Sequence, residues 1–165
     1  TVLEYLSQVD DTVAVVIDAD AIHAIAKNPT LIAGRRFVVT PNRFEFTLLT
    51  NREIQNVALA DRIPIVQEEA ARLQTTLVLK AKVDIISNGK EVLLNETGSP
   101  YMSVGGTGDT LAGAVGAILA RDIDPLIAAA AGAYINGKAG EAAAAKFKDA
   151  LVATDLIDAI REVIA

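Results

Sequence analysis

The chain has 165 residues, of which 52% are hydrophobic and 22% charged, with a formal net charge of -6. This composition excludes a disordered chain, and the negative charge argues against binding to nucleic acid or to an anionic membrane surface. Cysteine is absent and His23 is the single histidine, which excludes disulfide scaffolds, cysteine nucleophiles and multi-histidine metal sites. The longest apolar stretches reach about 11 residues, whereas a bilayer span needs about 20.

The first half of the chain alternates short apolar runs with helical patterns. The first residues are typical of the end of a helix that leads into a strand. Residues 13–17 (VAVVI) are a β-branched run, which predicts a strand buried on both faces, and residues 36–40 and 76–80 predict two more. We expect helices over 21–27, 43–49 and 66–73, the first of them ended by Asn28-Pro29.

The second half begins with a hairpin and continues with helices. Asn88-Gly89 is a hairpin turn signal between strands expected at 84–87 and 91–94, and the glycine-containing stretch 95–108 predicts a loop. Helices are expected over 109–120, over 125–139 with a continuation at 141–146, and over 155–163 with Thr154 as its cap. Strands that alternate with helices predict an α/β fold, a three-layer α/β/α sandwich with a mainly parallel sheet.

A glycine-rich segment is the strongest functional signal. Gly105, Gly106, Thr107 and Gly108 precede Asp109 at the start of an apolar helix. Glycines expose backbone N–H groups, and a helix N-terminus adds a positive dipole end, so this arrangement favours anions such as phosphate. It is neither a Walker loop nor a dinucleotide fingerprint. Asp109 would accept the proton of a hydroxyl that attacks phosphorus, or it would only cap the helix.

Other polar residues follow the expected strands. Asn42 and Glu45 lie three apart after the second strand, where Glu45 would act through Mg²⁺ or the pair would form a capping box; the pattern favours neither. Asp18 and Asp20 follow the first strand in either a turn or a ligand role. Further along the chain, Lys80 ends a strand, Asp84 lies four residues beyond it, and Met102 lies in the glycine-containing loop. Because the carboxyl ends of parallel strands meet at one edge, we expect the candidates to converge there.

Several stretches resemble a known family. GGTGDTLAG at 105–113 resembles the G-x-G-D signature of the ribokinase-like superfamily. VIDADAI at 16–22, the stretch 95–120 and LVATDLIDAI at 151–160 are similar to the carbohydrate-kinase-related NAD(P)H-hydrate dehydratase family, which repairs hydrated nicotinamide cofactors. The resemblance runs through most of the chain in the same order.

The resemblance implies a reaction and a set of roles. ATP or ADP would phosphorylate the hydroxyl of hydrated NADH or NADPH, and elimination of phosphate would restore the cofactor. Asp109 matches the base, which also contacts substrate, and Glu45 matches the acidic residue near Mg²⁺ and phosphate. The resemblance assigns an anion hole to Gly105, Gly106, Thr107 and Gly108. It assigns the nucleotide site to Lys80, Asp84, Gly98, Met102, Gly105, Gly106 and Gly108. The substrate site would consist of Asn42 and Asp20 together with Asp109.

Three positions depart from the family pattern. Asn42 and Phe44 stand where most of these dehydratases have His and Gly, and Ala81 stands where a Gly usually follows the Lys. The Asn42 version looks more like the N-x-x-E motif of pyridoxal and hydroxymethylpyrimidine kinases. A kinase of such a small molecule or of a sugar therefore remains an alternative, and a non-catalytic nucleotide-binding module is a third.

The resemblance also bears on the extent of the chain and on its partners. Family members carry a further portion before the DAD segment, so we expect residues 1–165 to be a single ribokinase-like domain that lacks an N-terminal portion. The expected partners are a nucleotide and a small-molecule substrate, with no nucleic acid and no membrane, in the cytoplasm. Members of the family often assemble, so a homo-oligomer is compatible with the resemblance.

Overall fold

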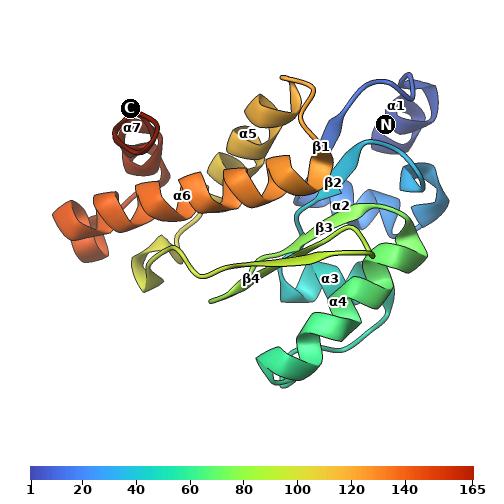
Figure 1. The fold of residues 1–165 in the computed structure, drawn as a ribbon, viewed down its shortest axis with the longest axis horizontal. Helices are drawn as coiled ribbons and strands as arrows, with labels where there is room; N and C mark the ends of the chain where they lie inside the picture. Colours follow the sequence, from blue (N-terminus) through green and yellow to red (C-terminus); the bar gives the residue numbers. More distant parts are fainter.

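A five-stranded sheet lies between two layers of helices in the computed structural model, which describes all 165 residues (Figure 1). Its strands are β1 (Val15–Ile17), β2 (Phe37–Val39), β3 (Thr76–Leu79), β4 (Asp84–Ser87) and β5 (Val92–Asn95), in the spatial order β1-β2-β3-β4-β5. The first three are parallel, and β4 and β5 are added antiparallel. The predicted α/β sandwich is confirmed, with the parallel pairs on the β1 side of the sheet and the antiparallel pairs on the β5 side.

Strands β2, β3 and β4 are apolar on both faces because helices cover both. In β2, Phe37 and Val39 belong to one apolar cluster and Val38 to the cluster on the opposite face. In β4, Ile85 and Ile86 divide in the same way. This alternation follows from the period of two along a strand, and it explains why the sequence shows continuous runs of hydrophobic residues.

The helices form two layers on the sheet (Figure 1). The layer that holds the larger cluster contains α1 (Val2–Gln8), α2 (Asp20–Ile25), α3 (Arg43–Thr50) and α4 (Leu59–Leu73). The other contains α5 (Thr107–Leu119) and α6 (Pro125–Phe147), and α7 (Ala153–Val163) packs against α6. Short 3₁₀ turns lie at Pro29–Ile32, Pro100–Met102 and Lys148–Ala150. None of these helices combines the length and the apolar character that a bilayer crossing requires.

The structure corrects three expected boundaries. Helix α4 begins at Leu59 rather than at residue 66 and contains Pro64, whose exposed ring costs the helix one backbone hydrogen bond. Helix α7 begins at Ala153, and Thr154 does not cap it; the Asp155 carboxylate instead accepts from the backbone N of Val152 at 2.9 Å. Helix α5 begins two residues before Asp109, so the predicted loop is shorter than residues 95–108.

Candidate functional site

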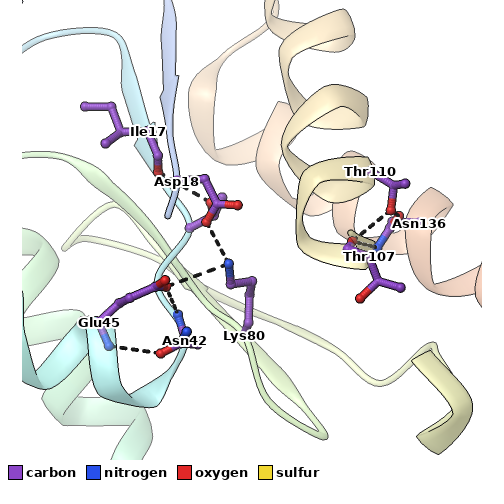
Figure 2. Close-up of polar contacts among 9 residues, drawn as sticks. Ile17, Asp18, Asn42, Glu45, Lys80, Thr107, Thr110 and Asn136 are labelled. Atoms are coloured by element: carbon purple, nitrogen blue, oxygen red, sulfur yellow. Dashed lines mark hydrogen bonds and ion pairs between the residues drawn. The ribbon is translucent and has the colours of Figure 1, made fainter. Parts of the chain in front are cut away.

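The three parallel strands deliver a charged cluster to their carboxyl edge. Asp18 follows β1, Glu45 lies in the first turn of α3 after β2, and Lys80 follows β3. The Lys80 ammonium lies 2.6 Å from Asp18 Oδ1 and 3.8 Å from Glu45 Oε2 (Figure 2). All three side chains are mostly buried, with 22% of Lys80 exposed. The predicted convergence at this edge is therefore present, with Lys80 as the shared cation.

The capping box expected as one role of Asn42 and Glu45 is formed. Asn42 Oδ1 accepts from the backbone N of Glu45 at 2.9 Å, and Glu45 Oε2 accepts from the backbone N of Asn42 at 2.7 Å (Figure 2). The box fixes the first turn of α3 and aims the Glu45 carboxylate at Lys80. Cap and charge cluster thus share one carboxylate, so the capping contact does not remove Glu45 from the site.

The glycine-rich segment opens α5 beside this cluster. Gly106 caps the helix at φ 95°, a left-handed conformation that glycine adopts without steric cost. Gly108 approaches so closely that a Cβ there would lie 3.4 Å from Lys80 Nζ and 3.6 Å from Asp18 Oδ2. The positive end of the α5 dipole therefore lies beside Lys80, whose charge is already paired with Asp18 and Glu45. The backbone N–H groups at the start of α5 are the groups at this place that favour an anion.

Asp109 lies in the first turn of α5 but does not cap it. Its side chain is exposed and makes no hydrogen bond or ion pair with the rest of the chain, and Gly106 occupies the cap position. The capping role considered for Asp109 is therefore wrong. A carboxylate at a helix N-terminus that faces solvent is accessible to a substrate hydroxyl.

Asp84 connects two segments beside the site by hydrogen bonds. Its Oδ1 accepts from the backbone N of Ala81 and its Oδ2 from Asn95 Nδ2, each at 2.9 Å. Burial raises the pKa of the Asp84 carboxyl above its ordinary value, against the opposing effects of these two hydrogen bonds and of the Lys80 charge. The two bonds tie the turn after β3 to the end of β5.

A cleft of about 720 Å³ runs from this edge. It lies between the turn after β3, the segment after β5, the start of α5 and the middle of α6. Its wall contains many of the residues singled out from the sequence: Asn42, Lys80, Asp84, Gly98, Met102, Thr107 and Gly108. Others lie outside its lining, namely Asp20, Glu45, Gly105, Gly106 and Asp109. Asp20 starts α2 and is exposed, and Gly105 and Asp109 are exposed on the glycine-rich segment.

Two cleft residues, Asn95 and Asn136, were missed in the sequence. Asn95 ends β5 and is buried, and Asn136 is buried in the middle of α6. The available signal was a polar amide within the apolar stretch 125–137 of that helix, because a buried amide needs hydrogen-bond partners. Asn136 finds them in Thr107 and Thr110 at the start of α5 (Figure 2).

Divalent metal ligands are few in this chain. No group of three or more His, Asp or Glu side chains is arranged to hold a metal ion. Asp18 and Glu45 do place two carboxylates around the Lys80 ammonium. Mg²⁺ is commonly held by one or two carboxylates together with substrate phosphates, so the donor set fits a magnesium ion that arrives with a nucleotide.

The fold and this edge define a protein of the ribokinase-like class. A ribokinase-like superfamily protein from Enterococcus faecalis superposes with a TM-score of 0.82 at 30% identity over 99% of this chain and 56% of its own. An ADP/ATP-dependent NAD(P)H-hydrate dehydratase from Bacillus subtilis, crystallised with ATP and Mg²⁺, gives a TM-score of 0.78 at 29% identity over 93% of this chain and 55% of its own.

Within that class the chain belongs to the NAD(P)H-hydrate dehydratase family, whose model matches residues 1–162. It is 45% identical to a bifunctional NAD(P)H-hydrate repair enzyme from Pyrobaculum aerophilum, over 92% of this chain and 29% of that protein. It is 39% identical to an ADP-dependent (S)-NAD(P)H-hydrate dehydratase from Nitrosopumilus maritimus, over 95% of this chain and 54% of that protein. The chain thus spans about half or less of the length of these relatives.

Proposed function

We propose that this chain carries the catalytic centre of a nucleotide-dependent NAD(P)H-hydrate dehydratase. The observation that carries the proposal is the meeting of the α5 N-terminus, with Asp109 in its first turn, and the Lys80 cluster at one edge of the sheet. An anion site next to an accessible carboxylate is the arrangement that phosphoryl transfer to a hydroxyl requires. The activities for which the relatives are named agree with this proposal.

Asp109 would act as the base. Its carboxylate takes the proton of the substrate's ring hydroxyl while that oxygen forms a bond to the terminal phosphorus of ADP or ATP. The bond from that phosphorus to the bridging oxygen of the nucleotide breaks in the same step. Phosphate then leaves the ring with the electrons of the C–O bond, water takes up a proton from the neighbouring carbon, and the electrons of that C–H bond form the double bond. Phosphorylation makes this elimination favourable because phosphate leaves more readily than hydroxide.

The residues around Asp109 would stabilise charge in transit. The backbone N–H groups at Gly106, Thr107 and Gly108 start α5, where they have no partners within the helix, and they would donate to the transferred phosphoryl oxygens. Lys80 would add a positive charge from the opposite side. A magnesium ion held by Glu45 and Asp18 would supply further charge neutralisation on the phosphates.

The cleft would hold the nucleotide. Lys80, Asp84, Gly98 and Met102 line it, and the glycine-rich segment lies at its end beside Thr107. Asn42 also lines the cleft, and its Nδ2 group remains free to donate because only its Oδ1 serves the cap. We assign that amide to the substrate, together with Asp20 at the start of α2.

A small-molecule kinase is the second candidate, because Asn42 and Phe44 depart from the dehydratase pattern at the substrate side. The two reactions share the base and the anion site and differ in product. Incubation of the full-length protein with hydrated NADH and either ADP or ATP separates them. Recovery of NADH absorbance with release of inorganic phosphate supports the dehydratase. No recovery with either nucleotide refutes it, and a stable phosphate ester of an added alcohol then favours the kinase.

A further inference from the structure

A buried amide on α6 holds the start of α5. Asn136 is 6% exposed. Its Oδ1 accepts from Thr110 Oγ1 at 2.7 Å, and its Nδ2 donates to the backbone oxygen of Thr107 at 3.4 Å (Figure 2). Thr110 Oγ1 also lies 2.7 Å from that same Thr107 oxygen. The first turn of α5 is therefore tied across the helix pair by a three-residue polar network.

The network reaches the segment before the helix as well. Thr107 Oγ1 lies 2.8 and 3.0 Å from the backbone oxygens of Met102 and Val104, which share its one hydroxyl proton. Thr107 therefore joins the loop that precedes α5 to the helix, and Asn136 fixes Thr107 from the other side. The glycine-rich segment between these contacts has little freedom to turn its N–H groups elsewhere.

The same face of α6 holds the rim of the cleft at three further positions. Gly137 and Gly140 lie where added Cβ atoms would come within 2.0 Å of Thr97 Oγ1 and Met102 Sδ. One residue beyond Gly140, Glu141 Oε1 accepts from the backbone N of Gly98 at 3.0 Å. Positions 136, 137, 140 and 141 share one helix face, so α6 contacts the segment 97–107 at several points.

We propose that Asn136 is a positioning residue for phosphoryl transfer. It fixes the first turn of α5 so that the backbone N–H groups beside Asp109 stay aimed at the transferred group. This proposal rests on the function proposed above. Donors that are preoriented stabilise developing charge without reorganising during the reaction, so loosening them lowers the rate of the chemical step more than nucleotide affinity.

Kinetics of three variants test the proposal: Asn136→Ala, Thr110→Val and the double variant. We expect each single change to lower kcat for dehydration by about tenfold to 100-fold, with KM for ADP changed less than about threefold. Because both residues act through one network, the double variant should be little slower than Asn136→Ala alone. Multiplied losses in the double variant would show that the two residues act independently and would overturn the network.

A stability control separates positioning from general loosening. Leu73 is buried in the apolar cluster of the opposite helix layer, no residue of which lines the cleft, so Leu73→Ala lowers stability without touching the network. Assayed well below the unfolding temperature of both variants, Leu73→Ala should keep kcat while Asn136→Ala loses it. Equal losses in the two variants, or a kcat within twofold of wild type for Asn136→Ala, would refute the proposal.

Amide hydrogen exchange gives a readout that does not depend on activity. The backbone N of Thr110 donates to Gly106 O at 3.0 Å in the first turn of α5, and that of Ala120 donates to Gly116 O at 3.0 Å in the last. Asn136→Ala should speed exchange at Thr110 and leave Ala120 unchanged. If wild type lacks dehydratase activity but this pattern holds, the proposed function fails and the positioning stands. Unchanged exchange at Thr110 overturns the positioning itself.

Discussion

Replacement of Gly137 by alanine tests whether α6 shapes the cleft. A Cβ at this position would lie 2.0 Å from Thr97 Oγ1 and 2.8 Å from the Thr97 backbone carbon. The hydroxyl can rotate away, but the backbone carbon cannot, so the segment after β5 must move off the helix. Overpacking of this kind costs about 1–3 kcal/mol. Alanine returns about 0.8–1.0 kcal/mol through its higher helix propensity. We expect a net loss of up to about 2 kcal/mol in the free energy of unfolding.

Two matched glycines in helices give the comparison. At Gly140 the nearest atoms all belong to the flexible Met102 side chain, so Gly140→Ala should cost less than Gly137→Ala. At Gly113 nothing lies within 4 Å of the added Cβ, so Gly113→Ala should stabilise the protein by about 0.5–1 kcal/mol. Urea denaturation measures the stability of all three variants. In an ADP titration, Gly137→Ala should bind more weakly than the other two. Equal stabilities for Gly137→Ala and Gly113→Ala would refute the close approach.

Two further predictions concern carboxylates. Glu45→Gln keeps an acceptor for the capping box, so stability should change by less than about 0.5 kcal/mol while the Mg²⁺ concentration for half-maximal activity rises; unchanged metal dependence would limit Glu45 to capping. The raised pKa of Asp84 makes its contribution to stability greatest below the unfolded-state value of 3.8 and smaller as pH rises through the folded-state pKa. Relative to wild type, Asp84→Asn should therefore gain stability as pH rises from 3.8 in urea titrations, and a difference that stays constant with pH would contradict this.

The sequence predicted the sheet well because strands buried on both faces leave a local signal. The run at Val15–Ile17 and the Asn88-Gly89 turn are recognisable without any tertiary information. The start of α4 was wrong by seven residues because Pro64 is a local helix breaker that the fold tolerates on an exposed face.

The site was predicted in its residue types more than in its contacts. The glycine-rich segment and the residues after the strands could be found because glycines and charged residues stand out next to runs of apolar residues. That Lys80 pairs with Asp18, 62 positions away, depends on the parallel order of β1, β2 and β3, which no local pattern contains. The contacts of Asn136 could not be predicted for the same reason, since its partners lie on α5.

Asp109→Asn tests the central claim most directly. The exposed carboxylate makes no hydrogen bond or ion pair within the chain, so the variant should fold and lose at most about 1 kcal/mol of stability, from the weaker interaction with the α5 dipole. We expect turnover of hydrated NADH to fall by about 10²- to 10⁴-fold, the range for loss of a general base. ADP affinity, measured by calorimetric titration, should stay within about threefold, a difference below 1 kcal/mol. Turnover that survives the substitution, or ADP binding that is lost with it, would contradict the assignment of Asp109 as the base.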